Sequence, residues 1–251
     1  MKAHPIILFL LAAVACSQAS AQTADEWSAK AEASERKGQT RAALEAYEKA
    51  DKLRPGRVAT LVKIAKQYGD LMTETKDVTE RKKLGYQSLY YSKKALETDA
   101  DNADAHLSVA ISTGKLTEFM GNKEKIEASR GIKREADIAL RLDPRSDYAH
   151  HMIGRWNQEL AGMNRATRAI AKVIYGGLPS ASYQDALDHF AKARGLRPDR
   201  LIHQIEYGRT LAMLGRKGDA RTELAKGMAM RSRDKDDAKA KERGQESMDG
   251  L

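Results

Sequence analysis

Residues 42–55 read AALEAYEKADKLRP, and the end of this stretch, ADKLRP at residues 50–55, recurs along the chain. An alanine with a leucine close behind it and a proline five residues later returns at residues 139–144 (ALRLDP) and 193–198 (ARGLRP). A further copy at residues 95–100 (ALETDA) lacks only the proline. Because proline has no amide hydrogen and clashes with the preceding turn, it ends a helix and forces the chain to turn. The phrase therefore predicts the end of a repeated helix.

Working back from each proline gives a repeat of 34 residues, which is the period of the tetratricopeptide repeat. The residues in its characteristic positions are Trp27, Gly38, Ala43, Tyr47, Ala50 and Pro55, then Ala186, Phe190, Ala193 and Pro198, then Tyr207, Gly208, Leu211, Gly215, Ala220 and Leu224. Small residues let two helices approach, a ring or large aliphatic side chain fills the space between them, and glycine permits the tight turn. We therefore predict an all-α tetratricopeptide-like superhelix of about five helix pairs over residues 22–230.

The middle of the chain departs from this period. The alanines of the recurring phrase, at positions 50, 95, 139 and 193, are separated by more than 34 residues. The extra residues fall at Thr73–Arg81, Gly121–Ser129 and Met163–Ser182, and they predict lengthened loops or inserted helices. In the third insertion one helical face gathers Met163, Ala166, Ile170, Val173 and Ile174. Such a stripe is typical of ordinary core, and the alternative is a basic amphipathic helix that touches a membrane or caps the groove.

The first residues are typical of an export signal. A weakly basic lead precedes an apolar run of eleven residues, Ile6–Cys16, and Ala19-Ser20-Ala21 offers a cleavage site before Gln22. Such a run is too short to span a membrane. We predict a signal peptide at residues 1–21 and export to the periplasm. In the alternative, residues 13–16 act as a lipobox and lipidated Cys16 anchors the protein to the bacterial envelope.

Composition limits the chemistry that the mature chain can perform. The only cysteine is Cys16, so a mature chain from Gln22 has no disulfide and no thiolate metal site. The formal net charge of +9 favours acidic partners, although interleaved charges also serve simple solubility. We expect no nucleic-acid partner.

Motifs of catalysis and cofactor binding are missing from the sequence. Five histidines remain beyond the signal region, at positions 106, 150, 151, 189 and 203, and none belongs to an H-E-x-x-H motif. His150 and His151 point about 100° apart on a helix, so they do not readily share one ion. Neither phosphate-binding glycine pattern is present. We expect a binding protein with no enzymatic activity, no cofactor and no metal. Residues 231–251 predict a polar tail that is disordered, with a frayed helix as the alternative.

Part of the chain resembles a known family. The segments that carry the likeness are residues 151–156 (HMIGRW), 168–176 (RAIAKVIYG), Pro179, 183–190 (YQDALDHF), and 116–134 with Gly121-Asn122-Lys123 and Ile132-Lys133. They resemble the regulator-of-microtubule-dynamics family over roughly residues 51–230. The resemblance implies a bundle of tetratricopeptide-like helix pairs. Eukaryotic members of that family are associated with microtubules and with organelle membrane contacts, where lipid binding is one proposed activity. The export signal argues against a microtubule role and marks this chain as an exported bacterial member.

In a solenoid of helix pairs, the first helix of each pair lines the concave face, where ligands usually bind. The candidate groove residues are Tyr148, Arg155, Trp156, Arg168, Ile202, Ile205, Arg209 and Met213. Because guanidinium can grip a carboxylate or phosphate with two hydrogen bonds, these arginines suit an acidic partner. We predict a scaffold that binds a peptide or protein partner in its groove. The alternative is a carrier or sensor of amphipathic lipids such as anionic phospholipid, and ordinary packing of these residues is the third interpretation.

Overall fold

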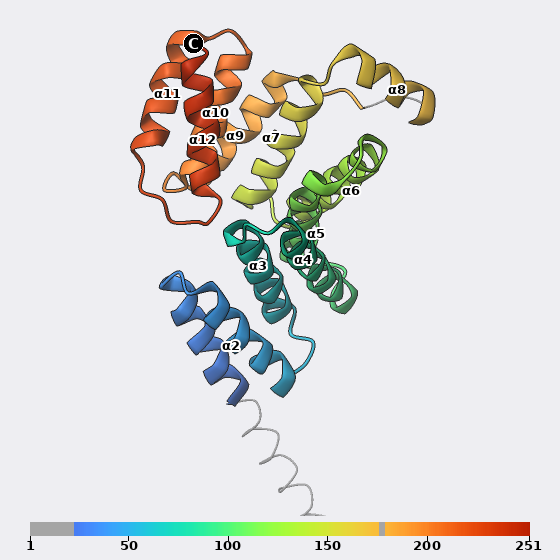
Figure 1. Cartoon of the computed structure of the whole chain (residues 1–251), viewed down its shortest axis with the longest axis vertical. Helices are drawn as coiled ribbons and strands as arrows, with labels where there is room; N and C mark the ends of the chain where they lie inside the picture. Colours follow the sequence, from blue (N-terminus) through green and yellow to red (C-terminus); the bar gives the residue numbers. More distant parts are fainter. Residues whose placement is uncertain (1–22, 176–178) are drawn as a thin grey trace, which may run out of the picture. The chain divides into compact units, whose positions relative to one another are not determined.

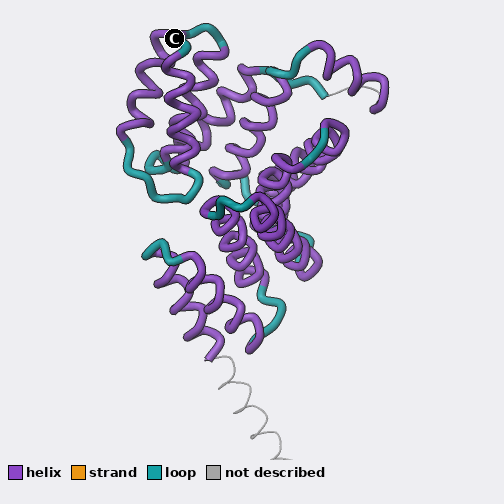
Figure 2. The backbone as a smooth tube through the Cα atoms, viewed as in Figure 1, coloured by secondary structure: helices purple, strands orange, loops and turns teal. Residues whose placement is uncertain are grey.

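The computed structural model describes residues 23–175 and 179–251. Within these ranges it describes only the backbone of Ala166, Ile170, Ile174 and Tyr175. The predicted signal peptide and Cys16 lie outside the described residues. Helices and loops make up the described ranges, which contain no strand (Figure 2). This confirms the all-α prediction. The chain divides into two compact units, unit 1 up to Ala100 and unit 2 from Asp101 to Leu251.

Unit 1 consists of two helix pairs. A helix at residues 23–36 precedes α2 (Thr40–Leu53), and α3 (Val58–Glu74) pairs with α4 (Val78–Thr98) (Figure 1). The repeat residues Ala43, Tyr47 and Ala50 are buried, as predicted for the contact between helices. Gly38 has a φ of 70°, a conformation that side chains other than glycine rarely adopt, and it makes the turn between the first two helices.

Unit 2 continues the same architecture through three more pairs. Its helices are α5 (Ala103–Leu116), the 3₁₀ turn η1 (Thr117–Phe119), α6 (Asn122–Leu142), α7 (Asp147–Ala161), α8 (Arg165–Tyr175), α9 (Tyr183–Leu196), α10 (Leu201–Met213), α11 (Lys217–Ala229) and α12 (Asp237–Asp249). The main packing partners are α5 with α6, α7 with α9, and α10 with α11. Together with unit 1, the described residues contain five helix pairs, as predicted, and α12 follows the last pair.

Glycines set the spacing of these pairs, as the repeat pattern predicts. A Cβ atom on Gly154 of α7 would lie 2.8 Å from the ring of Phe190 on α9. On Gly208 of α10 it would lie 2.9 Å from Leu224 of α11. Both distances are shorter than any normal carbon contact, so the two helices can approach this closely only where a side chain is missing. The large partner then fills the space between them.

The extra residues in the middle of the chain lengthen helices more than loops. Helices α4 and α6 each contain 21 residues, whereas α2 and α9 contain 14. At the first insertion Asp77 accepts a hydrogen bond from the backbone N–H of Glu80 at 2.7 Å, and this cap starts α4 after a short loop. The third insertion forms the additional helix α8.

The interpretation of the α8 stripe as core is wrong for Val173, which is 86% exposed. Met163 is half-buried, and the side chains of Ala166, Ile170 and Ile174 lie outside the described part of the chain. Helix α8 contains 11 residues and lies in the insertion between α7 and α9.

The prediction of a disordered tail from residue 231 is also wrong. Residues 237–249 form α12, which packs against α10 and α11. Ala240 and Gly244 are buried, and Ile205 of α10 lies against both α11 and α12. Two small residues one turn apart are sufficient for this contact, so the tail needs no large apolar stripe to fold. Across residues 23–175 and 179–251, no helix combines the length and hydropathy needed to span a bilayer.

Candidate binding face of helices α7, α10 and α12

Two helices of unit 2 present parallel rows of side chains. On α10, Ile202, Glu206, Arg209 and Met213 follow one another at intervals of three or four residues, which places them on one helical face. On α7, Tyr148, Arg155 and Glu159 share a face in the same way. Ser146 starts α7 by accepting a hydrogen bond from the backbone N–H of Ala149.

A cluster of three arginines around one carboxylate joins the rows, and we call Arg155, Glu206, Arg209 and Arg243 the arginine cluster. Arg155 Nη1 lies 3.0 Å from Glu206 Oε1, and Arg209 Nη1 lies 2.6 Å from Glu206 Oε2. Arg243 of α12 donates from both Nε and Nη2 to Glu206 Oε1, at 3.0 and 2.9 Å. One carboxylate therefore connects α7, α10 and α12.

Burial and charge act in opposite directions on Glu206, whose side chain has no exposed surface. Burial alone would raise the pKa of Glu206, but the positive charges of Arg155, Arg209 and Arg243 outweigh it and hold this pKa far below its ordinary value. Glu206 is therefore ionised at any physiological pH. The side chains of the three arginines are partly exposed, although Arg209 Nε is buried, and Glu159 provides a second carboxylate 2.6 Å from Arg155. Three positive charges thus face two negative ones.

A buried chain of hydrogen bonds continues from the cluster along α7 and α10. His203 Nε2 lies 2.8 Å from Asp147 Oδ2, and His203 Nδ1 lies 3.0 Å from His151 Nδ1. Burial is the largest cause that lowers the pKa of His151, and the neighbouring His203 adds to it. For Asp147, burial would raise the pKa, but the hydrogen bond from His203 and the charge of Arg200 reverse the effect and lower it. These hydrogen bonds hold α7 and α10 in register.

The structure brings together only part of the predicted site. Arg155 and Arg209 meet at Glu206, and Tyr148 and Met213 lie on the same rows, with Met213 exposed. Ile202 is almost completely buried.

Three predicted groove residues lie elsewhere. Ile205 and Trp156 are core residues, which corrects their assignment as groove residues. Ile205 fills the space beside Gly227 and Gly244, and Trp156 Nε1 donates to the Ser129 carbonyl oxygen at 3.1 Å. Arg168 donates to the Leu160 carbonyl oxygen and takes no part in the cluster.

Sequence reasoning missed Glu206 and Arg243, which complete the cluster. Glu206 is the only acidic residue of α10 and lies among apolar neighbours, a pattern that indicates a buried, paired carboxylate. Arg243 lies between Ala240 and Gly244, and the spacing of these two small residues could have indicated a packed helix. The composition of the tail concealed this signal.

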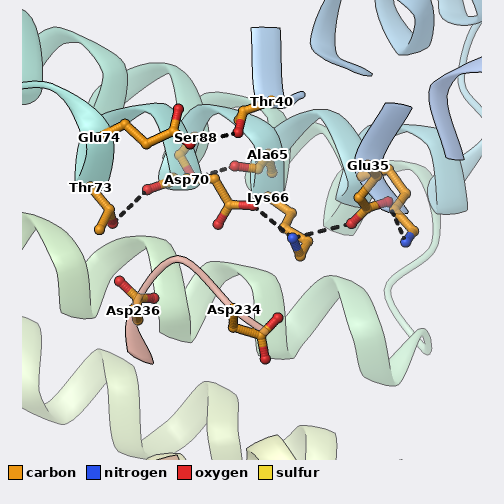
Figure 3. Close-up of polar contacts among 12 residues, drawn as sticks. Glu35, Thr40, Ala65, Lys66, Asp70, Thr73, Glu74, Ser88, Asp234 and Asp236 are labelled. Atoms are coloured by element: carbon orange, nitrogen blue, oxygen red, sulfur yellow. Dashed lines mark hydrogen bonds and ion pairs between the residues drawn. The ribbon is translucent and has the colours of Figure 1, made fainter. Parts of the chain in front are cut away.

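Unit 1 carries a second polar cluster, shown in Figure 3. Glu35 accepts hydrogen bonds or ion pairs from Lys63 at 3.0 Å and Lys66 at 3.1 Å, and Lys66 also lies 2.7 Å from Asp70. Tyr47 donates its hydroxyl to Glu35. Both lysines are partly exposed. Within the part of the chain that the structure describes, no group of three or more histidine, cysteine or acidic side chains is arranged to hold a metal ion.

Comparison with known proteins identifies relatives over almost the whole chain. The sequence profile of the family described as "Regulator of microtubule dynamics protein 1-3" matches residues 21–251. Regulator of microtubule dynamics protein 1 of Mus musculus is 32% identical over 157 residues, which cover 62% of this chain and 50% of the mouse protein. Protein 3 of Xenopus laevis is 29% identical over 138 residues, which cover 55% of this chain and 30% of the frog protein. The chain thus spans half or less of the length of these curated relatives.

Solved structures share the fold. A thermophilic TPR protein of Thermus thermophilus superposes with a TM-score of 0.61 at 15% identity, covering 92% of this chain and 98% of that one. The pilF protein of Pseudomonas aeruginosa gives a TM-score of 0.56 at 15% identity, covering 92% of this chain and 90% of that one. At this level of identity the likeness establishes the tetratricopeptide-like fold alone.

Proposed function

The chain belongs to the regulator of microtubule dynamics protein 1–3 family, and from this premise we propose that it is a scaffold that binds a protein or peptide partner on the face formed by α7, α10 and α12. The observation that carries the proposal is the arginine cluster. Three arginine side chains from three helices converge there, each partly exposed, and the carboxylates that pair with them are those of Glu206 and Glu159.

This arrangement suits an acidic group on a partner. The side chain of Glu206 uses the inner hydrogen bonds of the arginines and fixes their positions, so the outer N–H groups are oriented before any partner arrives. Oriented guanidinium groups bind carboxylates with little additional loss of side-chain entropy. The surplus of positive charge supports attraction of an acidic segment. We propose a binding role without catalysis, in line with the scaffold fold of the structural neighbours.

Site-specific photo-crosslinking tests this proposal. A photoreactive amino acid replaces Met213, which is 39% exposed and lies one turn beyond Arg209 on the same row. The control replaces Leu142, which is 42% exposed at the end of α6, away from this row. Irradiation of the source cells should give a defined protein adduct from position 213 and none from position 142. Equal adducts from both positions, or no adduct at all, would contradict a partner-binding face.

The same experiment addresses the lipid alternative. An anionic phospholipid headgroup shares the chemistry of a carboxylate toward guanidinium, so it could occupy the same arginines. A lipid adduct at position 213, identified by mass spectrometry of the crosslinked peptide, would replace the protein partner with an amphipathic lipid.

We further propose that the protein is exported, with Gln22 as its first mature residue. The apolar run at residues 6–16 and the following Ala19-Ser20-Ala21 support this proposal. Mass spectrometry of the protein isolated from its source should find Gln22 at the N-terminus. Fatty-acid labelling that is lost in Cys16→Ser would instead establish the lipid anchor, and a mature protein that keeps residues 1–15 in the cytoplasm would contradict both routes.

A further inference from the structure

The turn that precedes α12 contacts three separate places in unit 2. Arg233 Nη1 lies 2.9 Å from Asp199, in the loop before α10. The hydroxyl of Tyr148, on α7, donates to Asp234 at 3.4 Å. Lys115, at the end of α5, lies 2.7 Å from both carboxylate oxygens of Asp236. Both aspartates project from the same short turn (Figure 3).

We propose that Lys115, Tyr148 and Asp199 form a subsite for a partner segment with the order basic, acidic, any residue, acidic, and that Arg233-Asp234-Lys235-Asp236 occupies this subsite when no partner is bound. The inference rests on the proposed function and names the class of partner segment that this part of unit 2 accepts. The turn is thus an internal competitor of the partner.

The receiving side chains are held in place independently of the turn. Arg200 stacks on the ring of Tyr148, with its guanidinium carbon 4.2 Å from the ring centre, and lies 3.3 Å from Asp147. Burial raises the pKa of Tyr148, so its hydroxyl keeps its proton and donates. Lys115 is mostly buried along its length and presents a positive charge. Lys115 and Tyr148 as donors and Asp199 as acceptor are therefore preorganised for a segment with the order basic, acidic, any residue, acidic.

The occupying turn is suited to exchange. Residues 231–236 read RSRDKD and contain no apolar side chain that could anchor them in a core. The ion pairs that Arg233 and Asp236 make with unit 2 are partly exposed, and such pairs are weak individually. Helix α12 is held on α10 by the packing of Ala240 and Gly244. Asp237 accepts hydrogen bonds from the backbone N–H groups of residues 233 and 234, which tie the backbone of the turn to α12 but leave its side chains free of this contact. The side chains of the turn can therefore leave the subsite while α12 stays folded.

A competition experiment in trans tests the proposal. The probe is a fluorescent, end-blocked peptide of residues 229–238 (AMRSRDKDDA). The purified protein is compared with the double variant Asp234→Asn/Asp236→Asn, whose own turn has lost both charges. Because an intramolecular segment competes at a high effective concentration, the double variant should bind the peptide at least tenfold more tightly than the unmodified protein.

Two controls separate this effect from general electrostatics. Asp188→Asn/Asp249→Asn removes two exposed carboxylates that accept hydrogen bonds from glutamines on their own helices, and it should leave peptide affinity unchanged. Lys115→Gln in the double variant should abolish the tighter binding, with the melting temperature of each variant confirming a folded protein.

Equal peptide affinity in the unmodified protein and the double variant, or tight binding that survives Lys115→Gln, would overturn the inference. This failure is distinguishable from failure of the proposed function. A partner crosslinked at position 213 without any effect of the turn variants contradicts only the internal competitor, whereas the absence of a crosslinked partner contradicts the binding face itself.

Discussion

Each unit contains a carboxylate surrounded by positive charges. The two clusters differ in how deeply the carboxylate is buried and in whether lysines or arginines surround it. In unit 1, Glu35 meets Lys63 and Lys66 and remains partly in contact with water. In unit 2, Glu206 meets Arg155, Arg209 and Arg243 and has no exposed surface. The pKa of each carboxylate is lowered, because in both cases the nearby cations outweigh the effect of burial.

The difference shows how burial decides what an ion cluster does. A lysine ammonium is a strongly hydrated point charge, and it contributes little where water competes for it. A guanidinium group offers several N–H donors in a fixed plane, so three arginines can satisfy one fully buried carboxylate. Removal of the buried carboxylate leaves its partners repelling one another. We therefore expect the cluster of unit 2 to be structural as well as available for binding, and that of unit 1 to be a solvated surface feature.

The largest expected effect is that of Glu206→Gln. Three guanidinium groups would then surround a neutral amide, and we expect the free energy of unfolding of unit 2 to fall by about 3–5 kcal/mol. Glu35→Gln should lower the stability of unit 1 by about 1 kcal/mol or less, because water already screens that cluster. The two tryptophans make this measurable by urea unfolding, since Trp27 lies in unit 1 and Trp156 in unit 2. Variants that keep only one of the two tryptophans report the unfolding of each unit separately through their fluorescence.

A matched control lies on the same face. Glu159 pairs with Arg155 at 2.6 Å but is 69% exposed, so Glu159→Gln should change stability by less than about 1 kcal/mol. Equal losses for Glu206→Gln, Glu159→Gln and Glu35→Gln would show that burial does not govern these clusters.

The next largest effect concerns apolar packing in unit 2. Gly154→Ala would push a methyl group to within 2.8 Å of the Phe190 ring, and we expect a loss of about 1–3 kcal/mol from overpacking. Gly131 is also inside a helix, but a Cβ atom there meets nothing within 4 Å. Gly131→Ala should therefore stabilise the protein by up to about 1 kcal/mol through helix propensity. Thermal unfolding followed by circular dichroism distinguishes the two, and similar shifts for both variants would contradict the close approach of α7 and α9.

The smallest predicted effect is a pH dependence confined to unit 2. Burial is the main cause that lowers the pKa of His150 and His151 below 6.5 and that of His189 to about 4. The unfolded chain therefore binds protons below pH 6.5 that the folded chain does not, so stability falls as the pH falls from about 7 toward 4.5. Ordinary glutamates have a pKa near 4.5 and begin to bind protons about one pH unit above it, so the decrease in stability between pH 7 and about pH 5.5 comes from the histidines.

Unit 1 supplies the control, because residues 23–100 contain no histidine. The urea midpoint reported by Trp156 should decrease between pH 7 and pH 5 while that reported by Trp27 stays constant. His189→Gln should reduce the slope for unit 2. A parallel decrease in both units would indicate a general effect of charge instead.

The fold was predictable from the sequence because its determinants are local. Ala43, Tyr47 and Ala50 repeat as Ala186, Phe190 and Ala193, and small residues, large residues and helix-ending prolines recur at fixed spacing. Helix α12 was missed because its contact with Ile205 needs only Ala240 and Gly244, which a test for large apolar residues overlooks.

The candidate site was less predictable. Arg155 and Arg209 were identified as possible ligand contacts from residue type, but their shared partner Glu206 and the third arginine, Arg243, depend on contacts between helices that are distant in sequence. Ile202 and Ile205 were both assigned to the groove. Both are buried in one core cluster with Leu201, Leu224 and Ala240, where Ile205 also lies against Gly227 of α11 and Gly244 of α12.

We propose that the arginine cluster has two roles: it joins α7, α10 and α12, and it receives an acidic partner. The most direct test is a nuclear magnetic resonance titration of ¹⁵N-labelled protein with the partner captured at position 213, following the arginine Nε–H signals. The signals of Arg155, Arg209 and Arg243 should shift on binding. The signal of Arg216, an exposed residue that precedes α11 and pairs with Asp219, should stay in place. Partner binding that leaves the three cluster signals unchanged would contradict this proposal.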